Sequence, residues 1–263
     1  MKRILCILVG VTLLLSACGI PQPPETAATE TTAATTVPET TEVTTVPTTE
    51  ATEPPAQWPA VEDVISYFNE VCLDAEFTDG GDASLVQKWT IPISYRIYGE
   101  YSPEDLEVIK DFEDWLNTLE GFPGMGEALE GTEENLSVYF CEGAEFEDHL
   151  GEQYVGLDGG ITFWYDGDNQ IYDAIICYRK DMDRQTRNSV ILEEIYNGLG
   201  PVQDTELRPD SLIYAGFSTP QALTDIDRLL LRLLYHPDIT CGMDAAQCEA
   251  QIRRLYPNVI GLD

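Results

Sequence analysis

The chain has few basic residues. Only 14 of its 263 residues are Lys or Arg, against 47 Asp or Glu, which gives a formal net charge of -33. Because affinity for nucleic acid depends on neutralising phosphates with Lys and Arg, this balance argues against a nucleic-acid partner. The same sign of charge disfavours electrostatic binding to anionic lipids, so any membrane attachment has to be covalent or hydrophobic.

Histidine is scarcer still, and two common enzyme motifs are missing. Two His cannot build a three-histidine zinc site. No Gly-x-Ser-x-Gly is present, which argues against a serine hydrolase of that type. The glycines of residues 121–126 have no following Lys and therefore do not form a phosphate-binding loop. With 43% hydrophobic and 10% aromatic residues, the chain can still bury a substantial core.

The chain begins with a short apolar run, from Ile4 to Leu15, that follows Lys2 and Arg3. A run of this length does not span a membrane as a stable helix, so it predicts a removable signal peptide. Its end, Leu15-Ser16-Ala17-Cys18, resembles the lipobox of bacterial lipoproteins. The resemblance implies a signal peptide at residues 1–17 and diacylation of the Cys18 thiol, and two acyl chains give stable anchoring. We therefore expect the protein on the extracytoplasmic face of the bacterial cell membrane.

Residues 18–56 follow as a lipid-anchored stalk. From Pro21 to Ala56 the chain is rich in Thr, Pro and Glu and contains no Lys, Arg, Gly or aromatic residue. Such a composition cannot bury enough apolar surface to offset the entropy of ordering, so the segment predicts a disordered spacer.

Residues 57–263 predict one globular domain that contains both helices and strands. Apolar residues recur every three or four positions from Val61 to Ala75, which is typical of an amphipathic helix. Apolar and polar residues alternate from Trp89 to Tyr98, which indicates a strand. Ser102 is expected to cap a helix that reaches Leu119. The further elements expected are strands at Leu136–Cys141, Gly160–Tyr165 and Ile171–Tyr178, the last one central, and helices at Asp183–Leu199, Thr224–Tyr235 and Asp244–Tyr256.

The stretch Leu192–Gln203 resembles the zinc-binding helix of metzincin-type metallopeptidases, whose motif is His-Glu-x-x-His-x-x-Gly-x-x-His. Glu194 matches the general base, and Gly200 matches the glycine that turns the chain back toward the metal. The three ligand positions hold Glu193, Asn197 and Gln203 instead of His. The resemblance implies a peptidase-derived domain that has lost its zinc ligands.

Downstream segments extend the resemblance. Asp210–Tyr214 is similar to the Met-turn beneath the zinc, with Ile213 in place of Met, and the helix from Thr224 is similar to the last helix of that fold. The pattern also resembles a bacterial family of uncharacterised proteins, domain of unknown function 2927. The short sequence segments on which this resemblance rests are Lys88-Trp89, Glu193-Glu194, Leu199-Gly200, Asp210-Ser211, Arg232–Pro237 and Cys241–Met243. The fold implied is α+β (α/β-like) and zincin-like, with a twisted mixed sheet of about four to five strands, long helices and a C-terminal helical part.

The altered ligand positions leave several roles open for the two glutamates. One carboxylate and two amides suit zinc poorly, so no metal is expected, although Glu193, Asn197, Gln203 and Asp204 offer oxygens that suit Ca²⁺ or Mg²⁺. Alternatively, the glutamates hydrogen-bond to backbone or to Arg184 or Arg187 near the helix start. A third alternative is a carboxylate pair with an acid across the cleft, drawn from Asp204, Glu206 and Asp210.

Other polar residues have simpler explanations. Asp166-Gly167-Asp168-Asn169 has the chemistry of a hairpin turn, which accounts for its acids without Ca²⁺. His149 is expected to be exposed rather than to bind an ion with Glu147 and Asp148, and His236 to bond or pack near a helix end. Five cysteines remain in the domain, and Cys141 with Cys177 and Cys241 with Cys248 are candidate disulfide pairs.

These features predict a lipid-anchored cell-surface protein whose metallopeptidase-like domain is inactive and binds a peptide or a cell-envelope ligand, without a cofactor. A peptide could add to an edge strand of the sheet through main-chain hydrogen bonds. The alternative is a hydrolase, such as a peptidase, with a non-standard metal or carboxylate site around Glu193 and Glu194. A structural envelope component without a ligand cleft is a third class.

Overall fold

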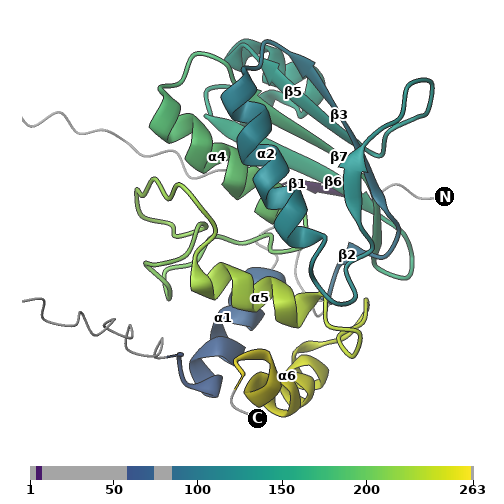
Figure 1. Cartoon of the computed structure of the whole chain (residues 1–263), viewed down its shortest axis with the longest axis vertical. Coiled ribbons are helices and arrows are strands. Elements are labelled where there is room, and N and C mark those ends of the chain that lie inside the picture. Colours follow the sequence, from purple (N-terminus) through teal and green to yellow (C-terminus); the bar gives the residue numbers. More distant parts are fainter. Residues whose placement is uncertain (1–3, 8–57, 74–84, 262–263) are drawn as a thin grey trace, which may run out of the picture. The chain divides into compact units, whose positions relative to one another are not determined.

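A computed structural model describes residues 4–7, 58–73 and 85–261. The expected lipidation site Cys18, the expected stalk and most of the expected signal peptide lie outside these residues. Within the described part of the chain, no helix is both long enough and apolar enough to cross a membrane. The described residues form a mixed α/β domain with a largely parallel sheet and helices (Figure 1).

In the described residues the sheet has seven strands, in the order β1-β6-β7-β5-β3-β4, with β2 beside one end of β7. The β6–β7 and β1–β6 pairs are antiparallel, and the other pairs are parallel. β7 pairs with β2, β5 and β6, which confirms its central place. The bounds are β1 Ile4–Ile7, β2 Lys88–Trp89, β3 Ile93–Gly99, β4 Met125–Glu127, β5 Leu136–Cys141, β6 Gly159–Tyr165 and β7 Gln170–Arg179.

The sheet therefore has more strands than the four to five expected. The stretch expected as one strand from Trp89 to Tyr98 is divided into β2 and β3, with Pro92 between them. Proline has no N–H to donate to a ladder, so it is confined to strand ends, edges and bulges. β1 and β4 are short strands that the sequence pattern did not predict.

The helices begin where capping residues occur. Ser102, Thr224 and Asp244 each form a reciprocal capping box with the residue three positions later, and Asp183 accepts from two backbone N–H groups. Ser102 was expected as an N-cap, and the other three residues are those at which the sequence predicted that helices start. The α-helices are α1 Val61–Leu73, α2 Pro103–Leu116, α3 Phe146–His149, α4 Arg184–Asn197, α5 Asp225–Leu234 and α6 Ala245–Val259, with short 3₁₀ turns at Gly143–Glu145 and Glu152–Tyr154.

The helices form two groups. α2 and α4 lie together across one face of the sheet, while α1, α5 and α6 make a helical part beside it (Figure 1). The main hydrophobic core is continuous between both groups and the sheet. A smaller cluster that includes Phe146, Leu150 and Tyr154 packs around Cys141 and Cys177.

Candidate carboxylate site on helix α4

The start of α4 is held by a buried ion pair with α2. Arg184 and Arg187 donate to the two carboxylate oxygens of Asp105 at 2.5 and 2.7 Å. The Asp105 side chain is fully buried, and the Arg187 side chain is only 8% exposed. Burial opposes ionisation of Asp105, but the N–H of Ser102 and the two guanidinium groups outweigh it and lower the pKa. The expectation that these arginines form hydrogen bonds with Glu193 or Glu194 is therefore wrong. Their carboxylate partner is Asp105, which lies on α2.

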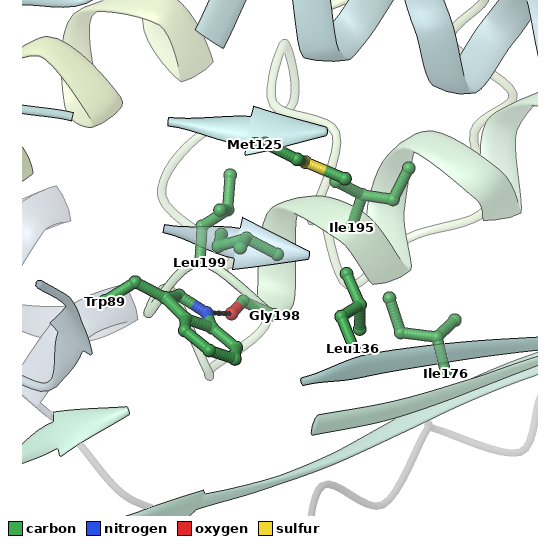
Figure 2. A pocket seen from close by; sticks show the side chains of 8 residues that line it. Trp89, Met125, Leu136, Ile176, Ile195, Gly198 and Leu199 are labelled. Atoms are coloured by element: carbon green, nitrogen blue, oxygen red, sulfur yellow. Dashed lines mark hydrogen bonds between the residues drawn. The ribbon is translucent and has the colours of Figure 1, made fainter. Parts of the chain in front are cut away.

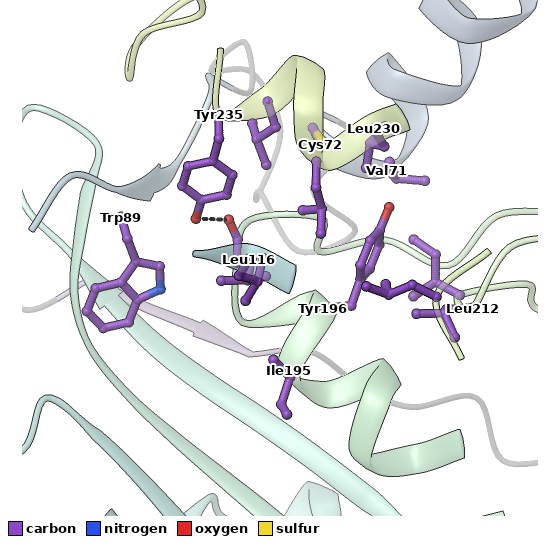
Figure 3. Packing of buried hydrophobic residues seen from close by; sticks show 14 of the residues in the cluster. Val71, Cys72, Trp89, Leu116, Ile195, Tyr196, Leu212, Leu230 and Tyr235 are labelled. Atoms are coloured by element: carbon purple, nitrogen blue, oxygen red, sulfur yellow. Dashed lines mark hydrogen bonds between the residues drawn. The ribbon is translucent and has the colours of Figure 1, made fainter. Parts of the chain in front are cut away.

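The end of α4 is capped by aromatic side chains from distant segments. The indole N–H of Trp89 donates to the carbonyl of Gly198 at 2.8 Å (Figure 2). The Tyr235 hydroxyl donates to the carbonyl of Leu199 at 2.9 Å (Figure 3). Two carbonyls that a helix terminus leaves without intrahelical partners are thereby satisfied.

The chain then turns at Gly200, where φ is +127°. A Cβ at this position would lie 2.5 Å from the carbonyl oxygen of Gln87, so only glycine fits. After the turn, the N–H groups of Val202 and Gln203 donate to the carbonyl of Val71 in α1. The turn expected at Gly200 is present, and it fixes the direction of the segment that contains Gln203 and Asp204.

Glu193 and Glu194 lie near the end of α4, where the helix crosses β6. Glu194 is 8% exposed, and Glu193 is partly buried. A Cβ on Gly159, the first residue of β6, would lie 2.7 Å from the Glu194 Oε1 atom and 2.5 Å from a methyl carbon of Val190. The absence of a side chain at Gly159 therefore lets the Glu194 carboxyl reach the sheet.

The surroundings of both carboxyls disfavour ionisation. Burial is the main cause that raises the pKa of Glu193 to about 8, and the charges of Asp204 and Asp158 raise it further. Burial, followed by the charges of Glu193 and Asp204, raises the pKa of Glu194 well above its usual range. Among the described residues, no basic group or hydrogen-bond donor offsets these effects. The site therefore holds protons near neutral pH.

Of the three acids considered as partners for the glutamates, Asp204 is the one whose charge acts on both. Asp210 forms an ion pair with Arg208 at 2.6 Å, and Glu206 is exposed. The segment Asp210–Tyr214, which resembles the Met-turn in sequence, is held by buried hydrogen bonds. The Ser211 hydroxyl lies 2.8 Å from both the Asp227 carboxylate and the Tyr67 hydroxyl. Ile213 is buried there, and its carbonyl accepts from the N–H of Thr205.

The residues at the zinc-ligand positions do not fit zinc. One carboxylate and two amides lack the imidazole or thiolate donors that zinc prefers. Within the described residues, no group of three or more His, Cys, Asp or Glu side chains is placed to hold a metal ion. Asn197 is 7% exposed, and its Oδ1 atom has no hydrogen-bond partner in the described part of the chain. The sequence did not reveal that this amide oxygen is a buried acceptor.

A comparison with protein families identifies the domain. A sequence model of the family described as "Protein of unknown function (DUF2927)" matches residues 61–254. The chain belongs to this family. No curated protein matches the sequence significantly. The matched range contains α4, the turn at Gly200 and the Trp89 and Tyr235 caps, so the carboxylate site lies within the DUF2927 domain.

The other polar residues singled out in the sequence have structural roles in the DUF2927 domain. The Asp166 carboxylate accepts from the N–H groups of Asp168 and Gln170 at 2.9 and 3.1 Å, which confirms the turn. The His149 ring stacks on Tyr139 with 3.9 Å between ring centroids. The Nδ1 atom of His236 accepts from the N–H of Asp238, near the end of α5.

All five cysteines in the described domain are free thiols. Neither candidate pair, Cys141 with Cys177 or Cys241 with Cys248, forms a disulfide in this structure. Burial raises the pKa of both Cys141 and Cys177. These thiols are therefore poor nucleophiles at neutral pH.

A small apolar cavity lies between α4 and the sheet, lined by Trp89, Ile93, Met125, Leu136, Ile176, Ile195, Gly198 and Leu199 (Figure 2). Its volume is about 10 Å³, which is about the space of one water molecule. The cavity is a packing gap behind α4 and is too small to hold a ligand.

Replacing Gly159 with alanine is expected to destabilise the domain by about 1–3 kcal/mol, because the new methyl group overlaps Val190 and Glu194. Thermal unfolding measures the effect. Gly167→Ala is the matched control, because a Cβ at Gly167 meets nothing within 4 Å. Equal melting temperatures for the two variants would contradict the close approach of Glu194 to β6.

Proposed function

We propose that this protein is a lipid-anchored bacterial cell-surface protein whose DUF2927 domain binds an extended peptide or peptide-like envelope segment along strand β6. The domain is derived from a zincin-like metallopeptidase and performs no metal-dependent hydrolysis. The predicted lipobox at Cys18 supports the anchor. The predicted stalk at residues 18–56 places the domain away from the bilayer.

The pairing of β6 carries the proposal. β7 pairs with one edge of β6, and the short strand β1 pairs antiparallel with the other. β1 consists of Ile4–Ile7, which lies inside the predicted signal peptide. Cleavage before Cys18 would remove β1 and leave the outer edge of β6 available. An open strand edge presents unpaired N–H and C=O groups that an extended peptide satisfies by strand addition.

The zincin-like interpretation is supported by the order of the elements around α4. The helix crosses the sheet beside the antiparallel strand β6, ends in a glycine turn at Gly200, and is followed by the buried Ile213 segment and by α5. The loss of all three histidine positions supports the proposal of an inactive site, because Glu194 without a metal is a weak peptidase catalyst.

Binding of synthetic peptides tests this function. We expect the protein purified from producing cells to bind a labelled eight-residue peptide of alternating Thr and Val, measured by fluorescence anisotropy. Two N-methylated forms, each methylated at alternate residues, remove the N–H groups from one edge or the other. One form should bind and the other should not, because strand pairing uses a single edge. Equal binding of the two forms, or no binding of the parent peptide, would refute strand addition.

A second candidate function is hydrolysis by the carboxyls alone. It is favoured by the burial of Glu193 close to a second acid: burial first and the charge of Asp204 next raise the pKa of Glu193 to about 8, and a carboxyl that keeps its proton at neutral pH can act as a general acid. Mass spectrometry of a peptide mixture incubated with the protein would reveal cleavage, and Glu194→Gln should abolish it. Metal content, measured in parallel with Glu193→Ala and Glu194→Ala variants, tests whether Ca²⁺ or Mg²⁺ binds there.

A further inference from the structure

The carboxyls of Glu193 and Glu194 have no basic partner among the described residues. The carboxyls of Glu193 and Glu194 experience only influences that raise the pKa, and these include the negative charges of Asp204 and Asp158. Asp158 is itself paired with Arg179 at 2.8 Å, at the outer side of the site. Once Glu193 ionises, the site concentrates oxygen atoms and negative charge, and a cationic hydrogen-bond donor would complement both.

Asn197 provides a buried acceptor at the same place on α4. Its Oδ1 atom is buried and has no partner among the described residues. Asn197 follows Glu193 by four positions and Glu194 by three, so all three lie on neighbouring positions of the same side of α4. An unpartnered buried acceptor is costly, and a donor placed by a ligand would remove that cost.

The register of β6 shows how a docked peptide would approach this place. Ile4 lies opposite Tyr165 and Ile7 opposite Thr162, so β1 covers only the C-terminal part of β6. A peptide that follows the same antiparallel register and continues for three residues places its seventh residue opposite Gly159. Directly opposed residues in an antiparallel pair point to the same face of the sheet.

That face is the one covered by α4. A Cβ on Gly198 at the end of α4 would lie 2.5 Å from the Cδ1 atom of Ile161, and a Cβ on Gly159 would lie 2.7 Å from the Glu194 carboxyl. Gly159 and Ile161 are two residues apart and share a face. The seventh side chain of the peptide would therefore point toward Glu193, Glu194 and Asn197, and the sixth would point to the opposite face.

We propose that the oxygen atoms of Glu193, Glu194 and Asn197 bind the ammonium group of a lysine-like side chain, carried by the peptide residue that lies opposite Gly159 on β6. The inference rests on the proposed docking of a peptide on β6. The preferred ligand is thus an extended peptide with one amine-bearing side chain at a defined position. An ammonium group donates three hydrogen bonds and needs no fixed coordination geometry, whereas no group of three acidic side chains in the described residues is placed to ligate a metal.

Binding of this ammonium group depends on pH. The titratable groups that face the two glutamates are Asp158 before β6, Asp204 after α4, and Cys177 and Tyr178 on β7. Burial raises the pKa of Cys177 and Tyr178 so far that both stay neutral. The pKa of Glu193 is raised to about 8, so between pH 6 and 9 this carboxyl gains the charge that attracts the ligand. The preference for an ammonium group should increase over this range.

Three peptides of equal length test the proposal at pH 9, where Glu193 is ionised and lysine keeps its charge, with the full chain produced in cells and purified in detergent. The first has Lys at its seventh position, the second has uncharged norleucine there, and the third has Lys at its sixth position. We expect the first to bind about tenfold more tightly than either of the others, as a charge-assisted hydrogen bond in a buried site predicts. Glu193→Gln should remove this advantage, and Asp204→Asn should reduce it.

The results distinguish the ammonium site from strand docking on β6. Equal affinity for all three peptides would overturn the ammonium site and leave strand docking on β6 intact. Equal affinity for the two lysine peptides would mean attraction to the acidic surface in general and would also overturn the site. Absence of binding by every peptide would overturn both proposals. Stoichiometric binding of Ca²⁺ or Mg²⁺ that removes the advantage of the first peptide would identify the site as a metal site instead.

Discussion

Asp105→Ala is expected to destabilise the domain by about 3–5 kcal/mol, because it leaves the buried guanidinium of Arg187 without its counter-charge. For a domain of this size, that corresponds to a melting temperature lower by roughly 10 °C. The remaining partners of Arg187 are the carbonyls of Lys180 and Glu100 and the ring of Phe140, none of which carries a charge. The capping box of α2 also loses one of its two hydrogen bonds, because the Asp105 carboxylate accepts from the N–H of Ser102.

Asp114→Ala is the matched control for this change. Asp114 is on the same helix and pairs with Lys110, but its side chain is 64% exposed. Exposed pairs contribute about 0–1 kcal/mol, so this variant should unfold close to the wild-type temperature. The double variant Asp105→Ala with Arg187→Met should recover part of the stability, since neither charge is then buried. A small effect of Asp105→Ala, or no recovery in the double variant, would contradict the buried pair.

The stability of the domain should fall as pH rises, in a way that depends on Glu193. The pKa of Glu193 is raised from an ordinary value of 4.5 to about 8, so the folded state holds a proton that the unfolded state releases. The unfolding free energy therefore decreases by up to about 1.4 kcal/mol per pH unit between these two values. Below pH 4.5 this contribution is fully present, and above pH 8 it is lost. Burial raises the pKa of Glu194 in the same direction.

Glu193→Gln and Glu194→Gln remove this dependence while keeping the shape of the side chain. Relative to wild type, each variant should be little changed at pH 4.5 and progressively more stable toward pH 8, as measured by urea unfolding across this range. Glu107→Gln removes one negative charge from an exposed site and is the control. A stability difference that is the same at every pH would show that the glutamates are ionised in the folded protein.

The helices α2, α4, α5 and α6 were predictable because their determinants are local, whereas the four-residue α3 was not predicted. Ser102, Asp183, Thr224 and Asp244 cap helices through bonds to residues two or three positions away, and the sequence contains both members of each pair. β7 was predictable as a central strand because it is apolar on both faces. By contrast, β2 and β4 have two and three residues, and only their pairing partners make them strands.

The candidate site was predictable in its position but not in its electrostatics. The spacing from Glu193 to Gln203 predicted a helix followed by a glycine turn, and both are present. The partner of Arg184 and Arg187 was not predictable, because Asp105 is 79 and 82 residues away in the sequence. The close approach of Gly159 to Glu194 also depends on how α4 crosses the sheet, which no local pattern encodes.

The dipeptide Lys88-Trp89 has a consequence for when the chain can fold. The Lys88 ammonium donates to the carbonyls of Leu234 and Ile239, which are 146 and 151 residues further along, and Trp89 donates to Gly198, 109 residues away. Contacts with such long sequence separation slow folding, because long loops must close before they form. During synthesis, these donors of β2 have none of their three acceptors until Gly198 has been made, and the set is complete only with Ile239. This part of the fold is therefore completed only when almost the whole chain has been made.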